Sequence, residues 1–178
     1  MHDHGKSDAI VQRSDTDKIL LIGNPNVGKS ALFGLLTGKY VTVSNYPGTT
    51  VEVTYGNAVI NKKRTLLIDT PGVNSLVPMS EDERVTRDML LTDRPGVIVQ
   101  VADTKNLRRA LLITIQLAEM AVPFLLDLNM DDEARSRGIV VDQDRLSELL
   151  GIEVVKTVAI RKSGIDRLLR GITKPRLS

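Results

Sequence analysis

The feature that most constrains this chain is the segment from Gly23 to Ser30, which reads Gly-Asn-Pro-Asn-Val-Gly-Lys-Ser and directly follows the nearly continuous apolar run 18–22. It matches the pattern G-x-x-x-x-G-K-S, in which a loop between a strand and a helix wraps its backbone N–H groups around phosphate oxygens. The N-terminus of the helix adds positive potential at the same place. The segment therefore predicts an α/β fold built around a nucleotide phosphate site.

The pattern also predicts roles for individual residues. Gly28 leaves room for the close approach of a phosphate, Lys29 is expected to reach the β and γ phosphates, and the Ser30 hydroxyl is expected to ligate Mg²⁺. The residues predicted to line the phosphates are Gly23, Asn24, Pro25, Asn26, Val27, Gly28, Lys29, Ser30 and Ala31.

Short apolar runs alternate with amphipathic segments from Lys18 onward, which is typical of strand–helix units that build a parallel sheet. Six strands are predicted, at 18–22, 51–60, 65–69, 96–102, 123–128 and 153–158, and helices at 29–37, 81–91, 107–119, 142–150 and 165–170. The segment 51–55 alternates polar and apolar residues, and a turn at 61–64 leads into the next strand, so these two strands are expected to form an antiparallel hairpin at one edge.

The expected fold class is therefore an α/β P-loop NTPase with a six-stranded, mainly parallel sheet, one antiparallel edge strand and helices on both faces. In such a sheet ligands bind outside the carboxyl ends of the strands. A length of 178 residues with 42% hydrophobic residues is enough for one domain with a buried core. The net charge of +2, without a long basic run, predicts no nucleic-acid partner.

Other classes of site are also disfavoured by composition. The chain contains no cysteine, which excludes cysteine nucleophiles and thiolate metal sites. No apolar stretch approaches the roughly 20 residues that span a bilayer, so the chain as given is expected to be soluble.

The segment Asn129-Met-Asp-Asp132 follows the fifth predicted strand and resembles the N-K-x-D signature of the GTPase superfamily. In that signature the Asp carboxylate accepts hydrogen bonds from guanine N1 and N2, a donor pair that adenine lacks. Met130 stands where the signature has Lys, and its flexible thioether chain can pack over the purine ring. The spacing favours Asp132 as the residue that reads the base, and Asp131 is the alternative.

Three further elements resemble the same superfamily. Asp69-Thr70-Pro71-Gly72 resembles the D-x-x-G element, in which the Asp reaches Mg²⁺ through water and the Gly amide senses the γ-phosphate. Thr50 is placed where the first switch loop offers a hydroxyl to Mg²⁺, and Thr49 is the alternative. Thr157-Val158-Ala159 resembles the T-S-A loop whose backbone amide contacts guanine O6, with Ile160 following and Val in place of Ser.

Several segments occur in the order found in the cytoplasmic G domain of the FeoB family, bacterial ferrous-iron transport protein B, which the chain resembles from about Lys18 to Arg170. Besides the phosphate loop they are Asn45-Tyr-Pro-Gly-Thr-Thr-Val-Glu52, Val101-Ala-Asp-Thr-Lys-Asn-Leu107, Asn129-Met-Asp-Asp-Glu-Ala134, Arg137-Gly-Ile139 and Leu146-Ser-Glu-Leu-Leu-Gly-Ile152. Tyr46, where the family has Trp, and the segment from Ile160 to Ser163 are mild departures.

The resemblance implies a domain that binds and hydrolyses GTP and whose switch loops regulate Fe²⁺ uptake. It implies a place on the cytoplasmic face of the bacterial inner membrane, with the helical spacer and membrane region of a longer protein as partners. The expected organisation is a flexible tail at 1–17, the G domain at 18–172 and a C-terminal tail at 173–178, without the spacer and membrane region. The oligomeric state is not predicted.

Val73 stands where Ras-like GTPases have a water-orienting Gln, so intrinsic turnover is expected to be slow, on the order of 10⁻³ per second or below. By resemblance, K⁺ held by Asn26 and by the carbonyls of Ser44 and Tyr46 would supply the missing charge. The alternative for Asn26 is a loop role, because Asn tolerates unusual backbone angles. The residues expected to act in catalysis are Asn26, Lys29, Thr50 and Gly72, with Mg²⁺ at Ser30, Thr50 and Asp69.

Two other functions remain open. A ribosome-assembly or tRNA-modifying GTPase shares Asn26 and a Pro-Gly-Thr-Thr loop, but the modest charge and the Val51-Glu52 pair argue against it. A slow nucleotide switch without significant hydrolysis is compatible with Val73 and Val158.

Overall fold

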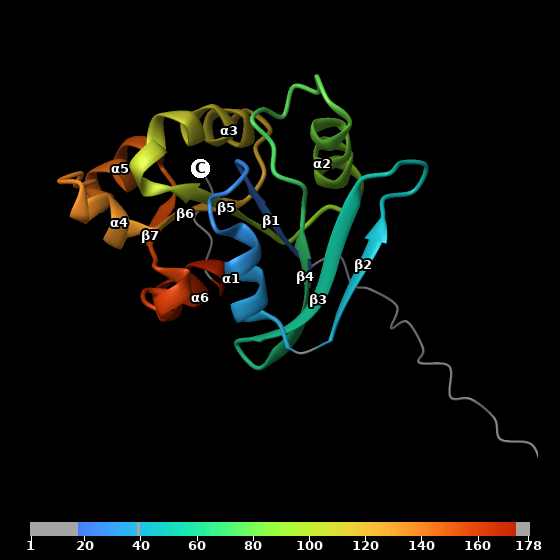
Figure 1. Ribbon diagram of the computed structural model, residues 1–178, viewed down its shortest axis with the longest axis horizontal. Coiled ribbons are helices and arrows are strands. Elements are labelled where there is room, and N and C mark those ends of the chain that lie inside the picture. The colour runs from blue at the N-terminus through green and yellow to red at the C-terminus, as the bar shows by residue number, and fades with distance from the viewer. Residues whose placement is uncertain (1–17, 39, 174–178) are drawn as a thin grey trace, which may run out of the picture.

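Strand β1 (Lys18–Gly23) lies inside a seven-stranded sheet, and all six of its residues are buried. In the computed structural model, which describes residues 18–38 and 40–173, the strand order is β2-β3-β4-β1-β5-β6-β7. Helices cover both faces of this sheet, which is why β1 is apolar throughout after Lys18 (Figure 1). The other strands are β2 (Val41–Asn45), β3 (Glu52–Ile60), β4 (Lys63–Asp69), β5 (Val97–Asp103), β6 (Phe124–Asn129) and β7 (Glu153–Lys156).

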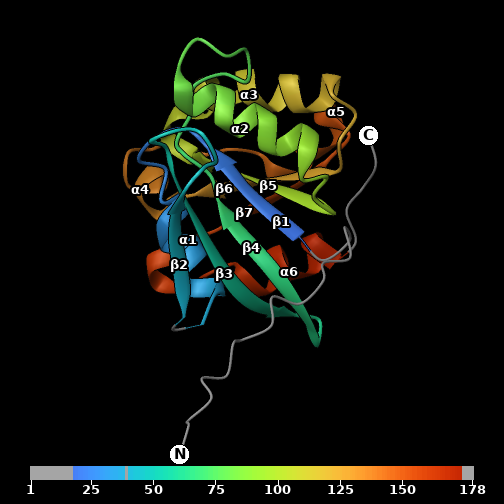
Figure 2. The same ribbon diagram turned by 90° about the vertical axis from the view of Figure 1, so that its right-hand side faces the viewer.

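The helices form a layer on each face (Figure 2). One core contains residues of α2 (Glu81–Thr92), α3 (Leu107–Glu119) and α5 (Gln143–Leu150). The core on the opposite face contains residues of α1 (Lys29–Leu36) and α6 (Ile165–Thr173). The short elements η2 (Thr104–Asn106), α4 (Asp131–Ser136) and η3 (Ala159–Arg161) follow strands β5, β6 and β7.

Five strands run parallel, so their carboxyl ends lie at the same edge of the sheet. β1 pairs in parallel with β4 and β5, β5 with β6, and β6 with β7. This arrangement brings the ends of β1, β4, β6 and β7 to one edge, as the sequence predicted. The phosphate loop, the Asp69–Gly72 segment and the two predicted base-binding segments follow these strands, whereas the first switch loop lies between β2 and β3.

The predicted fold class is confirmed, but the sheet has seven strands instead of six. The missed strand is β2, which pairs antiparallel with β3 and has five exposed residues. The edge of the sheet is therefore β2, whereas β3 and β4 form the predicted hairpin one position further in. Helix α4 was also not predicted. Helix α6 extends past its predicted end at 170 to Thr173, so Thr173 lies in this helix and not in the predicted tail at 173–178. The rest of that tail, 174–178, and the predicted tail at 1–17 lie outside the described residues.

The start of α2 shows a reciprocal cap. The Ser80 hydroxyl accepts from the Glu83 backbone N–H at 3.2 Å, and the Glu83 carboxylate accepts from the N–H groups of Met79 at 2.9 Å and Ser80 at 3.1 Å. The bond from Met79, together with those from Ser80, holds the pKa of Glu83 below its ordinary value of 4.5. This cap fixes where the loop after β4 ends and α2 begins.

Ser80→Ala is expected to lower the free energy of unfolding by about 1 kcal/mol, because the N–H of Glu83 then loses its acceptor. Ser80→Thr, which keeps the hydroxyl, serves as the matched control, and urea denaturation at neutral pH measures both. Because the pKa of Glu83 is depressed on folding, its contribution is present above about pH 4.5 and is lost as the pH falls through the folded value. Equal midpoints for the Ala variant and the parent chain would contradict this account of the cap.

Candidate functional site

The loop between β1 and α1 leaves the first amides of the helix without a side-chain partner. Gly28, at the N-cap of α1, has φ +83° and makes no side-chain cap, and the first turn carries no acidic residue. A Cβ at position 28 would lie 2.3 Å from Asn129 Nδ2, so both the angle and the space require glycine. Asn26 also has a left-handed backbone, with φ +64°. An uncapped helix start of this kind is a site for an anion.

Lys29, Ser30 and Asp69 meet at this helix start. Lys29 and Asp69 are buried, and the Lys29 ammonium pairs with one oxygen of the Asp69 carboxylate and donates to the Thr70 carbonyl. The Ser30 hydroxyl donates to the other carboxylate oxygen at 2.8 Å. A hydroxyl beside a carboxylate is the donor set that Mg²⁺ takes when phosphates and waters supply its remaining ligands. The described residues contain no group of three or more His, Cys, Asp or Glu that could hold a metal by themselves.

The segment after β4 packs directly against the phosphate loop. The Thr70 hydroxyl donates to the Leu21 carbonyl at 2.8 Å, and the Val73 N–H donates to the Gly23 carbonyl at 2.9 Å. A Cβ on Gly72 would lie 2.9 Å from Pro25 Cα, so the backbone of Gly72 touches the loop. The Val73 side chain is buried in the core, where it is unable to orient a water.

Asn24 and residues of α3 hold the continuation of this segment. Asn24 Nδ2 donates to the Val73 carbonyl at 3.2 Å. The Gln116 side chain accepts from the Leu76 N–H at 2.8 Å, and the Arg109 guanidinium donates to the Asn74 side chain at 2.6 Å. The segment 73–76 is therefore tied to both the phosphate loop and α3, which the sequence did not predict.

The predicted first switch loop, residues 46–51, makes hydrogen bonds mainly within itself. The Thr49 N–H and hydroxyl both donate to the Tyr46 carbonyl, and the same hydroxyl accepts from the Val51 N–H at 3.1 Å. Thr50 is exposed, and its hydroxyl lies 3.4 Å from Glu81. The hydroxyls of Thr49 and Thr50 thus have partners outside the Ser30–Asp69 pair.

The three residues predicted to hold K⁺ come from two separate elements. Asn26 lies in the phosphate loop, Ser44 lies in β2 opposite Val53, and Tyr46 directly follows β2. The Tyr46 carbonyl already accepts two hydrogen bonds from Thr49.

Asn129, at the end of β6, connects the phosphate loop with the predicted base-binding segments. Its Nδ2 donates to the Val27 carbonyl at 3.0 Å, and its Oδ1 accepts from the Ala159 N–H at 3.0 Å. The Thr104 hydroxyl donates to its backbone carbonyl at 2.7 Å. The Ala159 amide, which belongs to the loop predicted to contact guanine O6 through a backbone amide, thus donates to Asn129 in this structure.

Met130 begins α4 in a left-handed conformation, with φ +59°, and its methyl group lies close to Gly28. Lys105 Nζ lies 3.6 Å from its sulfur and forms ion pairs with Asp103 at 3.0 Å and Glu133 at 2.8 Å. Burial alone would lower the pKa of Lys105, but the bonds to Glu133 and Asp103 raise it above its ordinary value. The sequence showed Asp103 and Lys105 only as part of a family segment and gave them no role.

The two neighbouring aspartates at 131 and 132 have different surroundings. The Asp131 carboxylate is buried and pairs with Arg135 at 2.7 Å and Lys156 at 3.5 Å. Asp132 is partly exposed and lies 3.3 Å from Arg161 Nε. Asp132 therefore has the more accessible carboxylate, which agrees with the choice made from spacing.

The segment 158–163 forms a turn whose two ends are joined by backbone hydrogen bonds. Val158 and Ser163 exchange two backbone hydrogen bonds, at 3.0 and 3.2 Å. Gly164 has φ +79°, and a Cβ there would lie 2.1 Å from the Lys156 carbonyl oxygen. Ile160 is exposed beside Ala159, which is buried.

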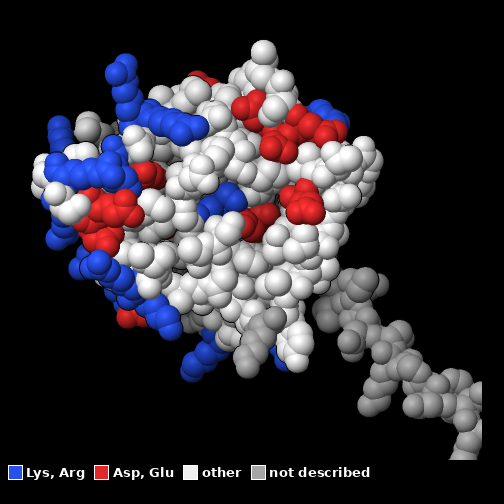
Figure 3. Space-filling model, in the orientation of Figure 1, with Lys and Arg blue, Asp and Glu red and all other residues white. Residues whose placement is uncertain are grey.

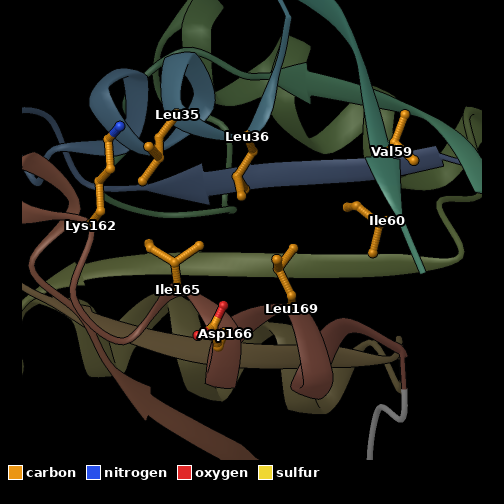
Figure 4. A pocket seen from close by; sticks show the side chains of 8 residues that line it. All are labelled: Leu35, Leu36, Val59, Ile60, Lys162, Ile165, Asp166 and Leu169. Atoms are coloured by element: carbon orange, nitrogen blue, oxygen red, sulfur yellow. The ribbon is translucent and has the colours of Figure 1, made fainter. Parts of the chain in front are cut away.

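Two hollows lie near α6. One, of about 350 Å³, lies between α1, β3 and α6, and its apolar lining includes Leu35, Leu36, Ile60, Ile165 and Leu169 (Figure 4). The other, of about 420 Å³, lies beside the segment 156–164 and is lined by Lys156, Lys162, Arg167, Arg170, Asp131 and Asp166. Basic side chains gather on the side of α4 and α6, and acidic ones over α2 (Figure 3). In the part of the chain that the structure describes, no helix has the length and apolarity needed to cross a membrane.

The sequence of this chain matches a known protein family and several of its members. The model of the family Ferrous iron transport protein B matches residues 17–172. The chain is 40% identical over 149 residues to the Fe(2+) transporter FeoB of Staphylococcus aureus (strain MSSA476), covering 84% of this chain and 22% of that protein. It is 38% identical over 158 residues to the Fe(2+) transporter FeoB of Salmonella typhimurium, covering 86% of this chain and 20% of that protein. The chain thus spans about a fifth of the length of these relatives.

Solved structures show the same likeness. A mutant of the S. thermophilus NFeoB protein bound to GDP aligns with a TM-score of 0.83 at 40% identity, covering 90% of this chain and 63% of that one. The G domain of the T. maritima FeoB iron transporter aligns with a TM-score of 0.82 at 36% identity, covering 88% of this chain and 96% of that one. The cytosolic domain of the T. maritima protein in a GMPPNP form aligns with a TM-score of 0.84 at 37% identity, covering 88% and 62%.

Proposed function

This chain belongs to the ferrous iron transport protein B family, and we propose that it is the domain of an Fe²⁺ transporter that binds GTP with Mg²⁺ and hydrolyses it to GDP and phosphate. The observation that carries this proposal is the convergence of Lys29, Ser30 and Asp69 at the uncapped start of α1. Similar structures described as bound to GDP or in a GMPPNP form support it.

The phosphates would lie against the amides of residues 24–31. Lys29 would turn from Asp69 and the Thr70 carbonyl to the β and γ phosphate oxygens, which are stronger acceptors for its charge. Ser30 would ligate Mg²⁺ directly and Asp69 would reach it through water. When bound, Mg²⁺ would neutralise charge that develops between the β and γ phosphates.

Guanine would lie between Met130 and the segment Val158–Ala159–Ile160, with Asp132 accepting from N1 and N2. Asn129 would hold this pocket together with the phosphate loop through its bonds to Val27 and Ala159. The accessible carboxylate of Asp132 supports this assignment, because Asp131 is already bound to Arg135 and Lys156.

The two switch segments would respond to the γ-phosphate. Gly72 already touches the phosphate loop at Pro25, so its amide needs little movement. Thr50 would exchange its contact with Glu81 for Mg²⁺, with Thr49 as the alternative, which requires the exposed first switch to move. This movement would carry the nucleotide state to the helical spacer and membrane region of the full transporter, at the cytoplasmic face of the bacterial inner membrane, and so regulate iron uptake.

Hydrolysis would depend on K⁺, because the buried Val73 is unable to orient water and Asn26, in the phosphate loop, would have an amide oxygen to offer beside the phosphates. The carbonyls of Ser44 and Tyr46 would complete the K⁺ site once the first switch closes. A cation there would act as a fixed positive charge on the transition state.

GTP hydrolysis is therefore expected to be faster in K⁺ than in Na⁺, by roughly tenfold to a hundredfold, and Asn26→Ala should remove that difference. Asn26→Gly separates the two roles of this residue, because glycine keeps the backbone freedom but has no amide. Asn61→Ala is the matched control, since Asn61 also has a positive φ, of 50°, but lies in the turn between β3 and β4. K⁺ stimulation that survives in Asn26→Gly would contradict the ligand role and leave the loop role.

A slow nucleotide switch is the second candidate function, favoured by the burial of Val73. It predicts GTP binding with equal, very slow turnover in both salts. A ribosome-assembly or tRNA-modifying function would instead give salt-sensitive binding to RNA, which a titration across ionic strength detects.

A further inference from the structure

Asp127 is a carboxylate buried inside the sheet that no step above uses. It lies on β6 two residues before Asn129 and is fully buried. Val101 of β5 and Val155 of β7 are its neighbours across the sheet. One carboxylate oxygen lies 2.7 Å from the Thr157 hydroxyl, and the other has no hydrogen-bond partner among the described residues.

The protonation of this carboxylate is set by burial. Burial raises the pKa of Asp127 to about 7, and the bond from Thr157 opposes part of that effect. The charged groups on the neighbouring loop and strands have other partners: Lys29 pairs with Asp69, Asp103 with Lys105 and Lys156 with Asp131. The charged residues of α6, which are Asp166, Arg167 and Arg170, are exposed. Glu153 lies on β7 two positions away, next to Gly171. Asp127 is thus expected to change charge near neutral pH.

Thr157 lies between this carboxylate and the Asn129 side chain, which joins the phosphate loop at Val27 to Ala159. Its oxygen lies 2.7 Å from Asp127 Oδ1 and 3.3 Å from Asn129 Oδ1, but a hydroxyl has only one hydrogen to donate. When Asp127 is ionised, the Thr157 hydrogen must point to Asp127, and the lone pairs of the hydroxyl face the Asn129 oxygen. When Asp127 is protonated, its O–H can donate to Thr157, and the Thr157 hydrogen is then free for Asn129.

We propose that Asp127 is a positioning residue for the guanine pocket, and that its proton, relayed through Thr157, tightens Asn129 and slows the release of bound GDP. Asn129 joins the phosphate loop at Val27 to the segment at Ala159, so one added bond at its oxygen stiffens both walls of the pocket. The inference rests on the proposed function, since it assumes that GDP occupies this pocket. One net hydrogen bond supports a change in release rate of about three- to tenfold.

The test is the release rate of N-methylanthraniloyl-GDP from the Mg²⁺-loaded chain into excess GDP. The rate is followed between about pH 5.5 and 8.5, a range that brackets a titration near neutral pH. The parent chain should release the analogue about three- to tenfold faster at the alkaline end, with a midpoint near the pKa of about 7. Asp127→Asn places a permanent N–H donor against Thr157, so release should stay slow and lose this pH dependence. Thr157→Val breaks the relay, so release should be fast throughout.

Titration of the nucleotide itself affects all variants equally and cancels in the comparison. A pH profile shared by the parent and Asp127→Asn, or a flat profile in the parent, would overturn the inference while leaving GDP binding intact. Failure of the parent to bind the analogue at all would instead overturn the proposed function, and this inference with it.

A second measurement covers the case in which Asp127→Asn fails to fold. The carboxyl carbon of Asp127 is followed by NMR in the unaltered chain, with and without GDP. The midpoint with GDP bound should coincide with that of the release rate and should lie above the midpoint without GDP, because the protonated form binds GDP more tightly. A midpoint that differs from the kinetic one, or that GDP leaves unchanged, would contradict the relay.

Discussion

The Asp132→Asn variant is expected to bind GDP at least about a thousandfold more weakly than the parent chain, a loss of about 4 kcal/mol. The carboxylate of Asp132 would accept from two guanine donors, N1–H and the N2 amino group. An amide in its place offers one acceptor and turns an N–H against a guanine donor, so polar groups remain unpaired in a confined pocket. Isothermal titration with GDP measures the loss directly.

The neighbouring carboxylate provides a matched control. Asp131→Asn removes the same charge one residue earlier, but Asp131 is buried against Arg135 and Lys156. This control should lose stability and keep its preference for guanine. The Asp132→Asn variant should gain relative affinity for xanthosine diphosphate, whose C2 carbonyl can accept from the new amide. If Asp131→Asn lost GDP and Asp132→Asn kept it, the base would be read by Asp131.

The second large effect is on stability. Asp127→Asn is expected to raise the free energy of unfolding at alkaline pH by about 4 kcal/mol. Folding raises the pKa of Asp127 from its ordinary value of 3.8 to about 7, so the folded chain binds the proton more tightly than the unfolded chain. The resulting stability is fully present below about pH 3.8 and is lost as the pH rises through about 7. A neutral amide does not incur this loss.

Urea denaturation across pH checks this prediction. The advantage of Asp127→Asn over the parent should grow by about 3 kcal/mol between about pH 5 and pH 8. Asp144→Asn is the control, because Asp144 is exposed on α5 and should give no comparable change with pH. A stability difference that does not vary with pH would show that folding does not raise the pKa of Asp127.

The parts of the fold that sequence predicts are those whose signal is local. β1, β5 and β6 are continuous buried runs, and α1 follows a loop whose glycine and lysine identify it. β2 carries no such signal, because all five of its residues are exposed and it pairs on one side only. Helix α4 has only six residues and starts from a left-handed Met130, so it has neither a helical period nor a side-chain cap.

In the site, too, the residues that sequence predicts are those whose signal lies in one short segment. The phosphate loop is contiguous, so its residues could be identified before the fold was known. The brace from Asn129 to Val27 joins residues 102 positions apart, and the pair of Lys105 with Glu133 depends on how η2 lies against α4. Asp127 reads as a polar interruption in a strand, and only the packing of both sheet faces shows that one of its oxygens has no partner among the described residues.

Phosphate release from GTP and from ATP, measured with Mg²⁺ and K⁺ present, is the most direct test of whether this chain hydrolyses GTP. We expect slow but measurable phosphate release from GTP and none from ATP, because Asp132 would meet the N1 and N2 donors only on guanine. Equal release from both nucleotides, or no release from GTP under these conditions, would contradict it.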